Sequence, residues 1–442
     1  MNRRQFLAAA SAWTCAAAAD LRLPAQTADA ADITLRIGEV TLDIGPKVSV
    51  RTLAYNGQVP GPLLRATRGQ RLVVDVINDT SARDVLHWHG FQIPPDVDGA
   101  YEEGTPAVPP HGRQRYAFTA APGGTRWYHS HDTPMRDLTK GTYTGQFGMF
   151  VVDEGTDSGA YDIEAPLLLH EWEPRFTRSG PLDVEFRAGS INGKMLGYGE
   201  PIRVRTGQRA LFRVLNASAT LTHRLSLTGH TFRIVALDGN AVPRPAAARV
   251  IELAPGERVD AIVELNNPGV WIFGEVDNTR RSAGLGIVVE YAGQSGEPRW
   301  SAPGPFPWDY TVFASSDATP EPDERRTLVF RAKDDGHHWT INGQSWPTVD
   351  PIVVREGRRY RWTLDNQSAN DHPIHLHRHT FEVVRVAGKP ISGLMKDVVV
   401  VPAWRQVEID VRADQPGLAL FHCHQQFHMD MGFMTMIRYQ GA

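Results

Sequence analysis

The segment His422-Cys423-His424, followed by His428, carries the side chains whose types and spacing are best suited to chemistry. Cys423 is one of two cysteines, and the other, Cys15, lies in an N-terminal leader that we expect to be removed. The mature chain would then hold one thiol and no internal disulfide. A lone thiolate among imidazoles suits copper, because two histidines and one cysteine form the trigonal ligand set of blue-copper sites.

Ten of the 17 histidines fall into four clusters. The clusters are His87/His89, His129/His131, His372/His375/His377 and His422/His424/His428. In a strand, residues i and i+2 face the same side, so each H-x-H pair offers two imidazoles on one face. The residue between them points the other way, which places Cys423 in a different pocket from its neighbours while joining the two pockets covalently. Four pairs supply eight imidazoles, which suit three copper ions, and leave Cys423, His372 and His428 for a single separate site.

Other metals and chance must be weighed against copper. A single H-x-H pair carries little information, because short motif matches are often accidental. Zinc also binds cysteine and histidine, but it would not use four such pairs around one cysteine. The number and placement of the pairs therefore favour copper.

One sequence unit occurs three times, at residues 61–91, 200–232 and 350–381. Each copy has a proline, a glycine flanked by basic residues, an apolar strand, an asparagine in a turn and a second strand. Its later half also recurs, because a Pro-Gly pair leads to WYHSH at 127–131 and to FHCH at 421–424. In the middle copy the same Pro-Gly leads only to WIFGEV, so the middle copy keeps the strands and lacks the H-x-H pairs.

The middle copy indicates which histidines the scaffold itself needs. His230 and His379 occur in the same H-T-F context in two copies, so we expect them to be structural or to support the ligands. His223 aligns with His372, and its role stays open.

Frequent turns and alternating polarity predict an all-β fold of consecutive antiparallel sandwiches. We expect a leader at 1–30 and domains at 31–155, 156–303 and 304–442, with copper ligands in the first and last domains only. The composition is ordinary for a soluble globular protein, with 41% hydrophobic residues and a formal net charge of -4. Neither nucleic acid nor a membrane surface is an expected partner.

The N-terminus predicts export. Arg3-Arg4 followed by Gln5-Phe6-Leu7 and an alanine-rich stretch is typical of a twin-arginine signal, and Ala28-Asp29-Ala30 fits a cleavage site. The twin-arginine export machinery is thus an expected partner, and a periplasmic or secreted location is expected. No later stretch approaches the ~20 apolar residues of a membrane span, so we expect no membrane anchor in the mature form.

Four motifs resemble those of the multicopper oxidase family, in particular its laccase-like, exported bacterial members. They are HWHG (87–90), HSH (129–131), HPIHLH (372–377) and HCHQQFH (422–428). The resemblance covers essentially the whole mature chain. It implies three cupredoxin-like Greek-key β-sandwich domains, four copper ions, dioxygen as electron acceptor and, in common with many members, a monomer.

The resemblance also implies a role for each ligand. It makes His372, Cys423 and His428 the type 1 copper ligands, with Cys423 as the electron-transfer residue and His428 near the surface. It makes His87 and His375 the type 2 ligands. The binuclear type 3 ligands would be His89, His129, His131, His377, His422 and His424.

Two further residues are expected near the copper ions without being ordinary ligands. Asp98 matches a family carboxylate that relays protons or holds a water, although a turn role before Gly99 is an equal alternative. The axial position beside type 1 copper falls on Phe433, which cannot coordinate, whereas a shift by one residue would present Met434. We favour Phe433, because core packing is the commoner role of methionine.

The resemblance predicts one-electron oxidation of a reductant at type 1 copper and four-electron reduction of dioxygen to water at a trinuclear cluster. A phenolic or aromatic reductant is the first expectation, and a metal ion, Mn(II) or Cu(I), is the alternative. A non-catalytic periplasmic cupredoxin scaffold would lack these ligands. A copper nitrite reductase would not need four H-x-H pairs.

Overall fold

The structure is a computed structural model and describes residues 30–155, 161–177, 184–333 and 338–441. The expected export signal, with Arg3-Arg4 and Cys15, lies outside the described residues. Within them, no helix is both long enough and apolar enough to cross a membrane.

The first repeat, residues 33–153, consists of two four-stranded sheets ordered β2-β1-β4-β6 and β3-β8-β7-β5. In β3 the side chains of Leu64 and Ala66 are buried while Arg65 and Thr67 face solvent, as the period of two in a strand requires. The elements are β1 (Ile33–Gly45), β2 (Val48–Tyr55), β3 (Leu64–Thr67), β4 (Arg71–Asn78), β5 (Leu86–His89), α2 (Pro95–Asp98), η1 (Tyr101–Glu103), β6 (Arg113–Thr119), β7 (Gly124–Ser130), η2 (Gly141–Tyr143) and β8 (Phe147–Asp153).

The middle repeat, residues 163–291, pairs a six-stranded sheet, β10-β9-β12-β17-β14-β15, with a five-stranded sheet, β11-β19-β18-β13-β16. The elements are β9 (Ile163–Phe176), β10 (Val184–Ile191), β11 (Ile202–Val204), β12 (Arg209–Asn216), β13 (His223–Leu227), β14 (Phe232–Leu237), β15 (Asn240–Ala248), β16 (Ile251–Leu253), β17 (Arg258–Glu264), β18 (Val270–Glu275), α3 (Asn278–Ser282) and β19 (Gly286–Tyr291).

The last repeat, residues 324–439, has the same arrangement, with sheets ordered β21-β20-β23-β28-β25-β26 and β22-β30-β29-β24-β27. The elements are β20 (Glu324–Ala332), β21 (Trp339–Ile341), β22 (Ile352–Val354), β23 (Arg359–Asn366), β24 (His372–Leu376), β25 (Phe381–Val386), β26 (Lys389–Lys396), β27 (Val398–Val401), β28 (Gln406–Arg412), β29 (Leu418–Cys423), α4 (Gln426–Asp430) and β30 (Met434–Tyr439), preceded by η3 (Tyr310–Val312). The prediction of an all-β sandwich fold is confirmed.

A buried asparagine positions the histidine strand of each repeat. The side-chain amides of Asn78, Asn216 and Asn366 donate to main-chain carbonyls four or five residues ahead. Each side-chain oxygen accepts the N–H two residues on, which forms the local turn that asparagine favours. The strand that follows is β5, β13 or β24, so one turn type places three equivalent strands.

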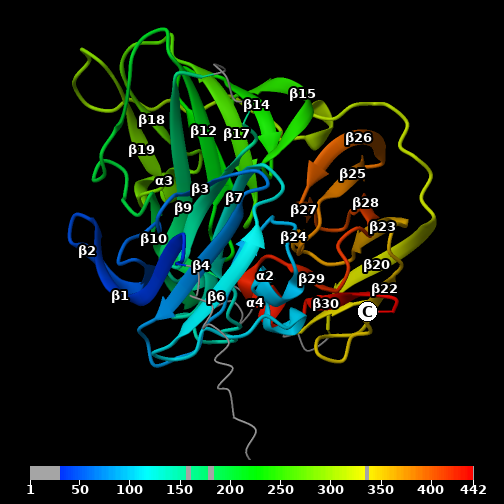
Figure 1. Ribbon diagram of the computed structural model, residues 1–442. Helices are drawn as coiled ribbons and strands as arrows, with labels where there is room; N and C mark the ends of the chain where they lie inside the picture. Colours follow the sequence, from blue (N-terminus) through cyan, green and yellow to red (C-terminus); the bar gives the residue numbers. More distant parts are fainter. Residues whose placement is uncertain (1–29, 156–160, 178–183, 334–337, 442) are drawn as a thin grey trace, which may run out of the picture.

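The three repeats surround a common centre. Figure 1 shows the middle repeat in green at the top, the first repeat in blue and cyan at the lower left, and the last repeat in yellow to red at the right. Trp127, Phe147 and Met149 of the first repeat pack in one apolar cluster with Leu168 and Leu215 of the middle repeat. The elements α2, α4 and β29 lie between the repeats (Figure 1), and β29 and α4 contain most of the last sequence motif, residues 422–428.

Candidate metal centre

Cys423, the one cysteine among the described residues, lies between two imidazoles. Cys423 Sγ is 3.6 Å from Nδ1 of His372 and 3.6 Å from Nδ1 of His428. His372 is the first residue of β24, Cys423 the last of β29, and His428 lies in α4. The three side chains are buried and their ligand atoms lie within 4.8 Å of one another, as one metal ion requires.

Aromatic rings enclose this pocket. The ring centroid of Trp339 is 4.6 Å from that of His372 and 4.4 Å from that of His428. The ring centroid of Phe433 lies 4.8 Å from that of His372. Met434 packs instead in the apolar cluster of Leu420 and Met429, away from Cys423. Neighbouring residues point in opposite directions here, so the structure places Phe433, and not Met434, beside the pocket.

Burial controls protonation in this pocket. Burial lowers the pKa of His428 to about 3, and burial together with His428 lowers the pKa of His372 well below its ordinary value. Both imidazoles are therefore neutral and have a lone pair to offer. Burial raises the pKa of the Cys423 thiol, so the thiolate forms only when a cation replaces the proton.

His428 differs from expectation in its exposure. Its side chain was expected near the surface, yet only 1% of the residue is exposed. The reason is the packing of Trp339 from β21 against the imidazole.

The remaining eight histidines of the four clusters form a second buried pocket. Their ligand atoms lie within 4.8 Å of one another in three groups. The groups are His87/His89/His375, His89/His129/His424 and His131/His377/His422. Each group combines histidines of the first repeat with histidines of the last.

Strand register explains how the pairs meet. His87 of β5 is directly opposite His129 of β7, and His375 of β24 is directly opposite His422 of β29. The two halves then join across the repeats, because the His87 ring stacks on that of His377 with centroids 3.9 Å apart. Residues separated by 290 positions thus share one pocket, which the sequence implied only through the resemblance.

The histidine nitrogens fit a metal cluster. Eight nitrogens of six of these histidines have no hydrogen-bond partner among the described residues. They are His87 Nε2, His89 Nδ1, His129 Nε2, His375 Nε2 and both ring nitrogens of His131 and His424. Buried polar atoms are rarely left unpaired, and each of these six histidines offers one nitrogen to at least one of the three groups. The Nε2 atoms of His377 and His422 lie 3.1 Å apart. Cations bound next to both atoms would stabilise this arrangement.

Main-chain carbonyls fix several of the rings. His87 Nδ1 is 2.9 Å from the carbonyl of Asp98, and His375 Nδ1 is 2.7 Å from that of Asp397. His422 Nδ1 is 2.9 Å from the carbonyl of Cys423. A carbonyl can only accept, so each Nδ1 carries the proton and each Nε2 presents a lone pair to the pocket.

Two buried carboxyl groups border this pocket. Asp98 Oδ2 lies 2.8 Å from His377 Nδ1 and 3.3 Å from His87 Nδ1. Glu103 Oε1 lies 3.3 Å from His377 Nδ1 and accepts the N–H of Leu420 at 2.6 Å. Burial and the adjacent Asp98 raise the pKa of Glu103 well above its ordinary value. Asp98 is thus no simple turn residue, and Glu103 was missed because a Glu-Glu pair in the sequence gives no sign of burial.

Three histidines outside the four clusters have polar partners within the scaffold. His230 Nε2 is 2.6 Å from the Tyr291 hydroxyl, and His379 Nε2 is 2.7 Å from the Tyr439 hydroxyl. His223 bonds to the carboxylates of Glu275, at 2.9 Å, and Glu171. The structure therefore gives these three histidines hydrogen-bonding roles.

Comparisons with known proteins agree with this geometry. Sequence models of the multicopper oxidase family match residues 36–157, 127–287 and 319–441. The multicopper oxidase MmcO of Mycobacterium tuberculosis is 29% identical over 449 aligned positions, covering 92% of this chain and 86% of MmcO. Bilirubin oxidase of Albifimbria verrucaria is 26% identical, covering 90% of this chain and 74% of that protein.

A solved structure shares the fold over most of the chain. The multi-copper oxidase from Pseudomonas thermotolerans superposes with a TM-score of 0.74 and 26% identity, covering 93% of this chain and 100% of that one. Together with the two histidine pockets, these matches identify the chain as a copper-dependent oxidoreductase that uses dioxygen, a member of the multicopper oxidase family.

Proposed function

We propose that this protein is a laccase-like oxidase that couples one-electron oxidation of a phenolic or other aromatic reductant to four-electron reduction of dioxygen to water. The observation that carries the proposal is the position of Cys423, whose two chain neighbours, His422 and His424, belong to the second pocket. A few covalent bonds therefore connect the two pockets.

In this proposal four copper ions are bound. Type 1 copper is held by His372, Cys423 and His428, with Phe433 as an axial non-ligand. Type 2 copper is held by His87 and His375. The type 3 pair is held by His89, His129 and His424 on one side and by His131, His377 and His422 on the other. This division follows the groups of nitrogens that lie within 4.8 Å of one another.

Bound copper supplies the one-electron redox chemistry at the first pocket and the reduction of dioxygen at the second. The chain's own residues provide the path and the protons. The main chain from Cys423 to His422 and His424 conducts electrons between the pockets. Asp98, 2.8 Å from His377 Nδ1, holds a proton-accepting carboxylate at the edge of the second pocket.

A cavity supports an aromatic reductant. A cavity of about 310 Å³ lies between the middle and last repeats and is lined by Trp308, Tyr310, Val400, Pro402 and Asp371. Its size is in the range of small-molecule sites, which are about 300–1,000 Å³. Asp371 directly precedes His372, and Val400 pairs with Pro373 in the adjacent strand. An aromatic ring bound in this cavity would lie beside Asp371, which directly precedes the proposed type 1 ligand His372.

Carboxylates in the same cavity support a second candidate, oxidation of a metal ion. Glu252, Glu257, Asp309 and Asp371 line the cavity, and the one basic residue among its lining residues is Lys389. Carboxylate oxygens are the ligands that hard cations such as Mn²⁺ prefer. An aromatic surface and an acidic one are thus combined in one cavity.

Oxygen uptake with phenols, aromatic amines, Mn(II) and Cu(I) would separate the candidates. Trp308→Ala should raise KM for aromatic substrates and leave that for metal ions unchanged, whereas Asp371→Asn should do the reverse. Copper analysis should give about four ions per chain. About two would indicate a copper nitrite reductase, and none would indicate a non-catalytic scaffold.

In this proposal the protein is exported by the twin-arginine machinery. It then works outside the cytoplasm as a monomer. The support for export is the Arg3-Arg4 leader and its cleavage site. Replacing both arginines by lysine should retain the precursor inside the cell, which fractionation would measure. Sedimentation of the mature protein at the mass of a dimer would contradict the monomer.

A further inference from the structure

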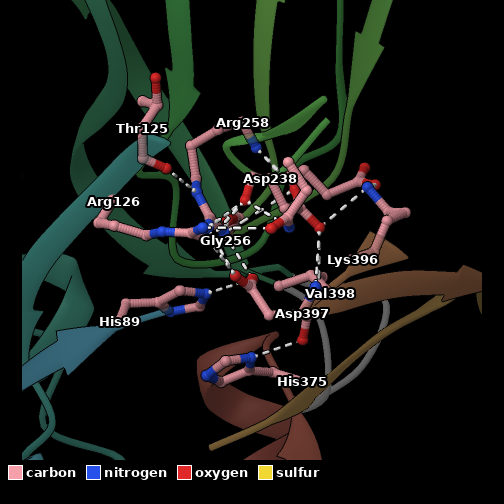
Figure 2. Close-up of polar contacts among 12 residues, drawn as sticks. His89, Thr125, Arg126, Asp238, Gly256, Arg258, His375, Lys396, Asp397 and Val398 are labelled. Atoms are coloured by element: carbon pink, nitrogen blue, oxygen red, sulfur yellow. Dashed lines mark hydrogen bonds and ion pairs between the residues drawn. The ribbon is translucent and has the colours of Figure 1, made fainter. Parts of the chain in front are cut away.

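One arginine of the middle repeat binds a carboxylate that borders the second pocket. Arg258, the first residue of β17, is fully buried, and its two terminal nitrogens donate to both carboxylate oxygens of Asp397 at 2.6 Å each. Figure 2 shows this pair at the centre of a polar network, with His89 and His375 directly below it. Such a bidentate, charge-assisted pair is strong and strictly oriented.

Every N–H of the Arg258 guanidinium has an acceptor. Besides Asp397, it donates to the carbonyls of Thr125 at 3.2 Å, Gly256 at 3.0 Å and Asp238 at 3.1 Å. A guanidinium has five donors in a rigid plane, so these main-chain oxygens of the first and middle repeats fix its orientation. Asp397, in the link between β26 and β27, must adopt the position that this plane dictates.

Asp397 in turn contacts two ligand histidines with two different atoms. Its Oδ1 lies 3.1 Å from His89 Nε2, and its main-chain carbonyl lies 2.7 Å from His375 Nδ1. A carboxylate bound to an arginine can only accept, so His89 carries its proton on Nε2 and presents Nδ1 to the pocket. His89 Nδ1 is the nitrogen without a partner among the described residues. The two rings stack with centroids 3.8 Å apart.

The rest of the network supports this arrangement. Asp238 Oδ2 accepts the N–H groups of Asp397 at 3.3 Å and Val398 at 3.1 Å, and it pairs with Lys396 Nζ at 2.9 Å. Arg126 approaches Asp397 less closely, at 3.4 Å. These contacts hold the link between β26 and β27 in place, but only Arg258 holds both carboxylate oxygens.

A glycine in the first motif provides the space. Gly90 has φ of 84°, and a Cβ there would lie 2.7 Å from Asp397 Oδ2 and 2.8 Å from Arg258 Nη2. A side chain at this position would push the ion pair away from His89. A glycine at the fourth position of the HWHG motif therefore suits both the local turn and the space that the ion pair of Arg258 and Asp397 occupies.

We propose that Arg258 is a positioning residue for the trinuclear site, acting through Asp397 to fix the ring orientation and tautomer of His89 and the ring orientation of His375. The middle repeat, which has none of the proposed ligands, thus orients one ligand of each neighbouring repeat and determines which nitrogen His89 presents. This inference rests on the proposed assignment of these histidines as copper ligands.

The test compares the wild-type protein with Arg258→Met, Arg258→Lys and Arg213→Met. Arg213 is the matched control, because it is 5% exposed and pairs with Asp260 at 2.9 Å at the same junction of repeats. Its side-chain hydrogen bonds among the described residues are with Asp260, Glu164 and Thr125, none of them a proposed ligand. The readouts are copper affinity by chelator competition, the electron paramagnetic resonance of type 2 copper and the visible band of type 1 copper.

Arg258→Met should weaken copper binding at the trinuclear site about 10- to 100-fold, the usual effect of losing a residue that orients a ligand. The type 2 resonance should change, the type 1 band should remain, and Arg258→Lys should restore part of the affinity. Arg213→Met should lower stability and leave the affinity and both signals at wild-type values.

The outcomes separate the inference from the proposed function. A wild-type protein without copper in the second pocket would overturn the proposed function. Wild-type loading combined with unchanged affinity and resonance in Arg258→Met would overturn the inference alone. If Arg258→Met does not fold, Asp397→Leu replaces it, because the apolar side chain has a similar size, offers no acceptor to His89 and leaves the main-chain carbonyl in place. Nitrogen NMR of copper-free Asp397→Leu should then show His89 no longer held as the Nε2–H tautomer, and retention of that tautomer would refute the proposal.

Discussion

The middle and last repeats build the same site with different side chains. His223 begins β13 and His372 begins β24. The two strands pair with equivalent neighbours, β13 with β16 and β18, and β24 with β27 and β29. In the register, Leu225 lies opposite Glu275 just as Ile374 lies opposite Cys423. Glu275 therefore occupies the position of the cysteine.

The equivalence continues beyond the thiol. The helices α3 and α4 follow at the same spacing, so Arg280 stands where His428 stands, and Leu285 stands where Phe433 stands. The Leu285 N–H donates to the Arg280 carbonyl at 3.2 Å, and the Phe433 N–H donates to the His428 carbonyl at 3.0 Å. The backbone of the proposed type 1 pocket thus also exists in a repeat that lacks its cysteine and its second histidine.

What differs is how the buried histidine is satisfied. Burial alone would lower the pKa of His223, but Glu171 and Glu275 outweigh it and raise the pKa to about 9. In the last repeat burial lowers the pKa of His372 instead. The comparison teaches that one backbone holds either an imidazolium between carboxylates or a neutral imidazole beside a thiol, and that the side chains alone select between them.

The largest effect is expected from the cysteine. Cys423→Ser should abolish the blue absorption and oxidase turnover, because a hydroxyl does not replace the thiolate ligand, while circular dichroism shows an intact fold. Glu275→Ser, at the equivalent position, should keep both the colour and the turnover. Blue colour in Cys423→Ser would contradict the type 1 assignment.

Replacing the middle histidine should affect stability and not colour. His223→Gln leaves Glu171 and Glu275 buried without a cation, which should lower the free energy of unfolding by about 3–5 kcal/mol. Urea denaturation would measure this, with His230→Gln as a control expected to cost about 1 kcal/mol. An unchanged midpoint for His223→Gln would show that the carboxylates do not depend on the imidazolium.

The same ion pair should make stability depend on pH. The pKa of His223 is about 9 in the folded protein and ordinarily 6.5, so its contribution is complete below pH 6.5 and is lost as the pH rises through 9. The free energy of unfolding should fall by about 3 kcal/mol across this range. His223→Gln should show a flatter profile, and equal slopes in the two proteins would refute the explanation.

The axial position should give the smallest effect. Phe433→Met adds a thioether donor and should lower the type 1 potential, since the axial ligand tunes it. A shift of about 59 mV corresponds to a tenfold change in a one-electron equilibrium, and redox titration of the blue band would resolve it. Leu285→Met, the equivalent change in the middle repeat, should leave the potential where it was.

Much of the fold could be predicted from the sequence. The all-β class followed from period-two alternation and turns, and the repeat was visible because each copy keeps its asparagine turn and Pro-Gly pair. The pairing of His87 with His129, or of His375 with His422, could not be read off, because strand register depends on contacts between distant segments. The burial of His428 could not be predicted either, because Trp339, which covers its imidazole, lies far from it in the sequence.

By itself the sequence determined the set of candidate metal-binding side chains, because strand alternation is local and carries each H-x-H pair to one face and Cys423 to the other. Only the tertiary structure decided which ring nitrogen His87, His89 and His375 present, because the acceptors that hold the other nitrogen come from other segments. Asp397 and Arg258 are 139 positions apart, and a buried ion pair of this kind leaves no periodic pattern in either segment. In our proposal the middle repeat, which has no proposed copper ligand, thereby orients ligands of the other two repeats.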